Sequence, residues 1–249
     1  IENINYNGVS INSKTSKKNN LFFAIKGKNH DGHKFAKQAL KKKVVKIVVS
    51  KIIKNIPKRK VIKVKNTFAS LNKLAKITRD NSLAEIIGIT GSVGKTTLKN
   101  LISFSLENYG KVYHSPHSYN NSYGVPFSLS NLKKNINYGV FEIGMDKKGE
   151  IDKLSKLVKP ETAIITNISG AHFKNFNTLK DIAKAKGEII NNISKGGNII
   201  LNKNDNFFYF LSKKAKKYKI NVITFSIKKK ADIYLISTMK IKNFFRLKV

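Results

Sequence analysis

The stretch that decides the fold runs from Ile86 to Leu98 and reads IIGITGSVGKTTL. Residues 86–89 predict a short buried strand, and the apolar spacing of residues 98–106 predicts a helix. Between them lies a loop of small residues that contains Gly-Lys-Thr-Thr. A strand, a glycine loop, Gly-Lys-Thr and a helix in this order are typical of a phosphate-binding P-loop.

The chemistry of this loop follows from its residue types. The predicted phosphate loop comprises Thr90, Gly91, Ser92, Val93, Gly94, Lys95, Thr96 and Thr97. Its glycines let the backbone N–H groups point inward, and the following helix presents the positive end of its dipole. Lys95 can reach the outer phosphates, and the Thr96 hydroxyl can ligate a phosphate-bound magnesium. The strict P-loop spacing requires a glycine at position 89, where this chain has Ile, so the loop is a variant of the motif.

The amino-acid composition limits the classes of protein to which this chain can belong. The chain has 249 residues, enough for two modest domains, and 41% of them are hydrophobic. The absence of cysteine excludes disulfides, thiolate metal sites and thiol nucleophiles. No apolar run approaches the roughly 20 residues that span a bilayer, and the first residues lack a signal-peptide pattern. We therefore expect a cytoplasmic protein with no membrane partner. Because the sequence does not begin with Met, we also expect a fragment.

The formal net charge of +35 raises the alternative of a nucleic-acid-binding protein with a P-loop core. However, only three of the 49 basic residues are arginine, at Arg59, Arg79 and Arg246. Nucleic-acid surfaces usually use arginine for bidentate contacts. The joint abundance of Lys, Asn and Ile favours A/T-rich codon usage with solvated lysines, so we expect no nucleic-acid partner. The general positive field still attracts anionic substrates.

The order of predicted elements indicates an α/β fold in two domains, at residues 1–82 and 83–249. In the first, strands are expected at 9–11, 21–25, 44–50 and 61–64, and helices at 35–43 and 67–79. In the second, strands are expected at 86–90, 111–114, 138–143, 162–166, 197–201, 222–225 and 233–236, and helices at 98–109, 150–157, 179–190 and 207–218. This alternation predicts a parallel sheet with helices on both faces and ligands at the carboxyl ends of its strands.

Two candidate ligands follow predicted strands. Glu142 lies at the end of an apolar strand, and a carboxylate there can hold magnesium beside the P-loop. His172 lies on the loop after the strand at 162–166, which is where functional residues gather. The chemistry of the residues leaves His172 open between a ligand and a structural histidine.

Three further residues carry weaker signals. Lys186 falls on the apolar face of a predicted helix, and burial of an ammonium is costly unless it is paired or modified. A snorkelling lysine is the alternative. Asn120 and Asn121 lie in a polar loop after a strand, which suits hydrogen bonding to a ligand but also an ordinary turn.

Seven segments together resemble the Mur ligase family. They are SINSKT, NLFFAIKGKNHDGHKF, ITGSVGKTT, YNNSYGVP, FEIGM, TNISGAHFKNF and IAKAKGEI. The resemblance implies a small N-terminal α/β UDP-binding domain, followed by a P-loop parallel-sheet ATP-binding central domain that is incomplete here. It also implies that the family's C-terminal domain is absent from this sequence, and we expect a monomer.

The resemblance also implies roles for individual residues. Lys95 would bind the ATP phosphates, with Asn120 and Asn121 lining the nucleotide and substrate cleft. Thr96 and Glu142 would hold a first Mg²⁺, His172 would help to hold a second, and Lys186 would be a carbamylated metal ligand. Ser13 would contact the uridine nucleotide. The family usually reads Asp-Ser-Arg around that serine, where this chain has Asn12-Ser13-Lys14.

The implied reaction is amide ligation in peptidoglycan precursor synthesis. ATP phosphorylates the terminal carboxylate of UDP-N-acetylmuramoyl-tripeptide, and the amine of D-alanyl-D-alanine attacks the acyl phosphate. A sister ligase of the same superfamily that adds a different amino acid is the alternative within this class. Without the C-terminal domain, we expect the 249-residue chain not to turn over alone.

Overall fold

The computed structural model describes residues 4–27, 29–170, 175–242 and 244–249. The chain divides into two compact units, one of Ile1–Ser82 with Pro126–Lys134 and one of Leu83–Val125 with Asn135–Val249. The short segment Pro126–Lys134 thus packs with the first unit although it lies far along the chain. The assignment of a UDP-binding and an ATP-binding domain to residues 1–82 and 83–249 stays a prediction.

The first unit is built on four parallel strands in the order β1-β2-β3-β4. Its elements are β1 (Gly8–Ser10), β2 (Asn20–Phe23), the 3-10 helix η1 (Gly32–Phe35), α1 (Ala36–Lys41), β3 (Lys46–Val49), the 3-10 helix η2 (Lys58–Lys60), β4 (Val61–Lys63) and α2 (Thr67–Asp80). The Asn66 side chain accepts a hydrogen bond from Ala69 N and so caps the start of α2.

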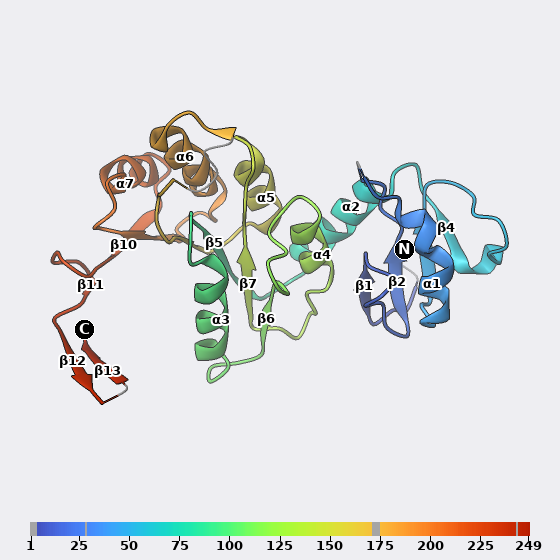
Figure 1. Ribbon diagram of the computed structural model, residues 1–249, viewed down its shortest axis with the longest axis horizontal. Helices are drawn as coiled ribbons and strands as arrows, with labels where there is room; N and C mark the ends of the chain where they lie inside the picture. Colours follow the sequence, from blue (N-terminus) through green and yellow to red (C-terminus); the bar gives the residue numbers. More distant parts are fainter. Residues whose placement is uncertain (1–3, 28, 171–174, 243) are drawn as a thin grey trace. The chain divides into compact units, whose positions relative to one another are not determined.

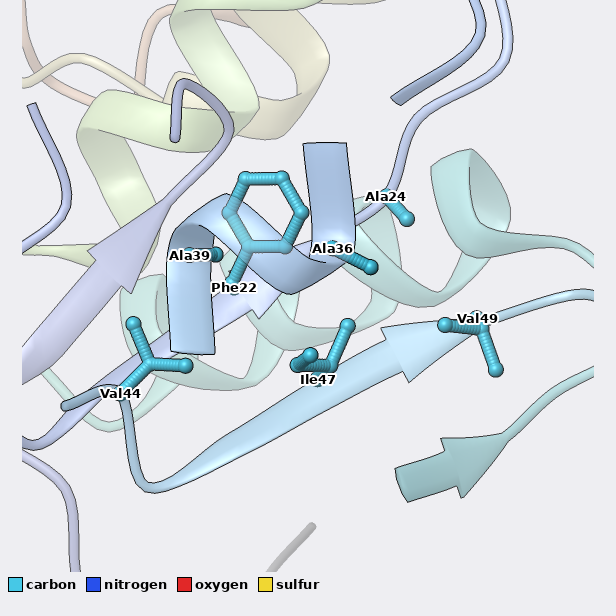
Figure 2. Packing of buried hydrophobic residues seen from close by; sticks show 7 residues of the cluster. All are labelled: Phe22, Ala24, Ala36, Ala39, Val44, Ile47 and Val49. Carbon is cyan, nitrogen blue, oxygen red and sulfur yellow. The ribbon is translucent and has the colours of Figure 1, made fainter. Parts of the chain in front are cut away.

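Alternating side chains along β2 fill two separate cores of this unit. Phe22 packs with Ala36 and Ala39 of α1 on one face of the sheet, as Figure 2 shows. Leu21 and Phe23 point to the opposite face, where they pack with leucines of α2. This separation follows from the two-residue period of a strand, and it produces a sheet covered by helices on both sides.

The second unit holds a seven-stranded, all-parallel sheet in the order β11-β10-β9-β8-β5-β7-β6. Its strands are β5 (Glu85–Thr90), β6 (Val112–His114), β7 (Tyr138–Glu142), β8 (Thr162–Ile165), β9 (Asn198–Asn202), β10 (Asn221–Ser226) and β11 (Ile233–Tyr234). The helices that connect them are α3 (Lys95–Leu106), α4 (Gly124–Ser130), α5 (Glu150–Val158), α6 (Leu179–Lys186), the 3-10 helix η4 (Gly187–Asn192) and α7 (Phe208–Lys217). Figure 1 shows α3 beside β5 and β7.

Strand β5 decides how helices cover this sheet. Ile87 and Ile89 pack with apolar residues of α3 on one face. Gly88 points to the other face, where a Cβ atom would lie 3.2 Å from Pro160 Cβ and 3.4 Å from Ile189 Cδ1 of η4. The expected parallel sheet with helices on both faces is therefore confirmed.

Apart from shifts of a few residues at the ends of elements and the short 3-10 helices η1 and η2, the structure departs from the sequence predictions as follows. Helix α3 begins at Lys95, three residues before the predicted start. Helix α4 begins inside the predicted polar loop, and its Pro126 is tolerated because the first turn of a helix leaves N–H groups unbonded. The predicted helix at 179–190 changes to a 3-10 helix after Lys186. An antiparallel hairpin of β12 (Ser237–Ile241) and β13 (Phe244–Lys248), red in Figure 1, was not predicted.

No helix within the described residues is long and apolar enough to cross a membrane.

Asn131 joins the segment Pro126–Lys134 to the edge of the first sheet. Its Oδ1 accepts a hydrogen bond from Val9 N at 2.8 Å, and its Nδ2 donates to Val9 O at 3.2 Å and to Phe127 O at 2.9 Å. One amide side chain thus satisfies both backbone groups of a residue in β1. In the same unit, Phe127 packs against the core that contains Val9.

We expect Asn131→Ala to lower the free energy of unfolding by about 1–3 kcal/mol, because it leaves the partly buried backbone groups of Val9 without partners. Urea denaturation followed by circular dichroism measures this change. Asn135→Ala, a few residues further along the chain, serves as the control. Equal stability of the Asn131 and Asn135 variants would contradict the role of Asn131.

Candidate functional site

The predicted phosphate loop lies where the order of the second sheet reverses. Strand β5 is central, with β7 on one side and β8 on the other. The chain leaves β5 for β6 at one edge and later returns to β8 on the opposite side of β5. Parallel α/β sheets bind ligands at the carboxyl ends of strands at such a switch point. The loop after β5 therefore lies at the position where sheets of this topology bind ligands.

Gly91 holds the loop against the segment that follows β8. Its φ of +144° is a backbone conformation that favours glycine. A Cβ atom at this position would overlap with Thr166 Oγ1. Glycine is thus required here by both the backbone angle and the close approach of Thr166.

Two lysine ammonium groups converge on the carbonyl oxygen of Gly91. Lys95 Nζ donates to it at 2.9 Å and Lys186 Nζ at 2.8 Å, and Lys95 also donates to Ser92 O at 3.3 Å. The Lys186 side chain is 1% exposed. Burial, together with the nearby charge of Lys95, lowers the pKa of Lys186 to about 7. Burial also lowers the pKa of Lys95, against an opposing effect of Glu142.

Glu142, at the end of β7, connects the loop to a second polar segment. Its Oε2 accepts a hydrogen bond from Thr96 Oγ1 at 2.8 Å, and its Oε1 accepts one from Asn120 Nδ2 at 2.7 Å. The residue is 1% exposed, and its backbone N–H donates to Ser115 Oγ at 3.1 Å. The structure therefore brings together three of the predicted site residues: Thr96, Asn120 and Glu142.

The loop is clamped by the segment after β8. Ser92 N donates to Asn167 O at 3.0 Å, and the Ser92 hydroxyl bonds to both the carbonyl and the N–H of Ser169. Thr166 Oγ1 donates to Val93 O at 2.7 Å. These contacts fix the loop before any ligand is present, which reduces the entropy that binding must overcome.

Helix α3 presents its unbonded N–H groups at the end of this loop. Its N-cap is Gly94, with φ of +82°, and Leu98 N donates to Gly94 O at 2.9 Å as the first bond of the helix. The N–H groups of residues 95–97 precede that bond and have no partner within the helix. A helix N-terminus beside the half-buried Lys95 is an arrangement that suits a phosphate group.

The other predicted residues lie as follows. Thr90 is buried at the end of β5, whereas Val93 and Thr97 are exposed. Asn121 Oδ1 accepts hydrogen bonds from Tyr123 N and Gly124 N, so its side chain caps the start of α4. Ser13, in the first unit, donates from Oγ to Gln38 Oε1 at 2.8 Å. His172 lies outside the described residues.

The donor set fits a magnesium ion that binds together with phosphate. Mg²⁺ prefers oxygen ligands and usually keeps several waters, so one or two protein oxygens suffice beside substrate phosphates. Thr96 Oγ1 and Glu142 Oε2 supply two oxygens that already lie 2.8 Å apart. Within the described part of the chain, no three His, Cys, Asp or Glu side chains gather into a cluster for a metal without phosphate.

A small cavity of about 260 Å³ opens next to these residues. Its lining includes Lys95, Asn120, Tyr123, Met145 and Asp146. A larger groove of about 1000 Å³ lies within the first unit, along α2 and residues 130–134. We place the candidate site at the smaller cavity, because its lining includes Lys95 of the predicted phosphate loop and Asn120, which bonds to Glu142.

Sequence reasoning missed several residues that the site uses. Lys99 is buried and lies one helical turn after Lys95, but in a chain with 49 basic residues nothing in the sequence marks it. Thr166 and Asn167 are marked only by their place at the end of a predicted strand and directly after it. Ser115, which accepts a hydrogen bond from the Glu142 backbone, carries no signal that a sequence alone could show.

Known proteins resemble the chain over almost its whole length. The model of the Mur ligase middle domain matches residues 89–246, and that of the Mur ligase family catalytic domain matches residues 5–86. A UDP-N-acetylmuramoyl-tripeptide–D-alanyl-D-alanine ligase from Rickettsia prowazekii is 39% identical over 94% of this chain and 52% of its own length. The protein of the same name from Bacillus subtilis is 36% identical over 78% of this chain and 42% of its own length.

A solved structure shares the fold. The MurF ligase from Thermotoga maritima, determined in complex with ADP, is 29% identical and superposes with a TM-score of 0.80 over 96% of this chain and 55% of that one. The chain spans about half the length of the curated relatives it matches. Because the middle-domain model alone covers well over half of the 249 residues, the chain belongs to the Mur ligase family.

Proposed function

We propose that this chain carries the nucleotide-binding part of an ATP-dependent amide ligase that adds D-alanyl-D-alanine to UDP-N-acetylmuramoyl-tripeptide in the cytoplasm. The observation that carries the proposal is the hydrogen-bonded set of Thr96, Glu142 and Asn120 beside a P-loop. Relatives that share this chain's sequence at 36–39% identity bear the name of that ligase.

The geometry suggests how the residues act on ATP. Lys95 Nζ bonds to loop carbonyls, and a short rotation would move it to the phosphate oxygens, which are stronger acceptors because they are charged. The N–H groups at the start of α3 would hold the same phosphates. Thr96 and Glu142 would hold Mg²⁺, which supplies neutralisation of negative charge on the transferred phosphoryl group.

Lys186 is the residue whose chemistry depends most on burial. Its ammonium lies beside Lys95 and bonds to a neutral carbonyl oxygen, so its charge lacks a compensating carboxylate in the described contacts. Reaction of the neutral amine with CO₂ would give a carbamate and release one proton. The product would place a negative charge beside Lys95, which removes the like-charge repulsion. His172 would complete a second metal site with this carbamate.

In the same proposal, Ser13 contacts the uridine nucleotide, with its hydroxyl oriented by Gln38. Asn120 and Asn121 line the cleft for nucleotide and substrate.

The amine substrate that accepts the acyl group distinguishes this proposal from a sister ligase of the superfamily. ADP release by a protein of the relatives' full length should rise with D-alanyl-D-alanine and not with single amino acids.

We expect Lys95→Ala to weaken binding of MgADP to the 249-residue chain by about 10- to 100-fold, because a charge-assisted hydrogen bond contributes about 1.5–3 kcal/mol. Isothermal titration calorimetry measures this affinity. Lys216→Ala, which removes the same charge from an exposed site on α7, should bind like the wild type. Unchanged affinity of the Lys95 variant would remove the P-loop assignment.

We expect the wild-type chain to show a carbamate resonance in ¹³C NMR when it is equilibrated with ¹³C-bicarbonate, and Lys186→Ala to lack it. With a pKa of about 7, the neutral amine that reacts with CO₂ increases as the pH rises from about 6 to about 8, so the resonance should grow over that range. Lys216→Ala is the control. A spectrum without a resonance that depends on Lys186 would contradict the modification.

A further inference from the structure

Lys99 is a buried lysine that the proposed mechanism leaves unused. It lies one helical turn after Lys95 on α3 and is 1% exposed. Its Nζ donates to Ser115 O at 2.8 Å and to His117 O at 2.6 Å. Burial lowers its pKa, and the charge of Glu142 opposes that shift. A buried ammonium on two neutral carbonyls must contribute something that a leucine would not, because its desolvation is costly.

The two carbonyls belong to a turn that is otherwise strained. His117 lies between Pro116 and Ser118 with φ of +47°, which is uncommon for a residue other than glycine. Such a conformation is energetically costly and persists only where the surroundings fix it. Lys99 binds the carbonyls on both sides of Pro116, so its ammonium closes this turn onto α3.

The same turn leads directly into the candidate metal site. Ser115 Oγ accepts a hydrogen bond from Glu142 N, and Asn120 Nδ2 donates to Glu142 Oε1. Asn120 is itself held by Gly144 N, which donates to Asn120 O at 2.8 Å. A hydrogen bond from Asn120 to one carboxylate oxygen leaves the other, Oε2, directed at Thr96.

We propose that Lys99 is a positioning residue: it fastens residues 115–121 to the P-loop helix and thereby keeps Glu142 Oε2 aimed at Thr96, where magnesium binds with the nucleotide. This inference rests on the proposed function of Thr96 and Glu142 as magnesium ligands. Release of the turn removes one restraint on residues 115–121 and leaves Asn120 held by Gly144 N alone at its carbonyl, so that the Glu142 carboxylate can rotate toward the Lys95 ammonium. Lys99 thus acts on the metal through the orientation of a ligand and without contact to it.

The test compares nucleotide affinity with and without magnesium. Lys99→Met removes the ammonium and keeps most of the stem. We expect the gain in affinity for a fluorescent ADP analogue on addition of Mg²⁺ to fall by roughly tenfold or more, as for other residues that orient metal ligands. Affinity without Mg²⁺ should stay within about twofold, because the phosphate contacts of Lys95 and α3 are unchanged.

Two further variants separate positioning from packing. Ser103→Ala alters another buried polar side chain of α3, one turn away, whose Oγ donates to Lys99 O, and it should keep the full magnesium gain. Lys99→Arg retains charged donors and should restore most of the gain. A loss of equal size in Ser103→Ala, or an unchanged gain in folded Lys99→Met, would overturn the proposal.

A measurement that needs no ligand tests the role of Lys99 even if the proposed function is wrong. Hydrogen–deuterium exchange of the peptide from residues 112–123 should be faster in Lys99→Met than in wild type or Ser103→Ala. If the wild-type chain binds no MgADP, the proposed function fails, and this exchange result alone decides whether Lys99 fixes the turn. If circular dichroism shows that neither Lys99→Met nor Lys99→Gln folds, Lys99 is required for the fold and the positioning role is overturned.

Discussion

The close contact between Gly91 and Thr166 is the constraint on which the candidate site depends. Because Gly91 has no side chain, the loop after β5 can lie directly against the segment after β8. That approach turns the Gly91 carbonyl toward the two lysines, Lys95 and Lys186, and allows Ser92 to bond to residues 167 and 169. Any larger residue at this position would separate the two segments and dismantle the arrangement of charges.

Positive charges outnumber negative charges around this contact, which favours binding of a polyphosphate. Lys95 and Lys99 are partly and fully buried near one carboxylate, Glu142, and Lys186 is buried beside Lys95. Burial lowers the pKa of all three lysines, which measures the cost of keeping positive charge out of water. A bound anion would offset that cost. The proposed nucleotide would supply such an anion, and phosphoryl transfer is favoured by charges that are already in place before the reaction.

Much of the second unit could be predicted, because its signals are local. The strand–loop–helix order around Lys95 and the apolar strand before Glu142 are contiguous in the sequence, and both form in the expected order, although α3 begins three residues before its predicted start. Helix α4 was missed because glycine and proline at its start have the same composition as a turn. The hairpin of β12 and β13 was missed because its side chains are exposed on both faces, so no alternation of burial marks its strands.

The sequence by itself determined the α/β class and the strand, glycine loop and helix around Lys95, since each of these depends on a short contiguous pattern, and it predicts which residues bind phosphate and magnesium. Only the tertiary structure decided that Lys186 shares a carbonyl with Lys95, which lies 91 residues earlier in the chain, and that Asn131 completes the edge of β1. It also decided which of the many lysines are buried. The physical reason is that burial and hydrogen-bond partners are set by packing between distant segments, and no local spacing of residues encodes that packing.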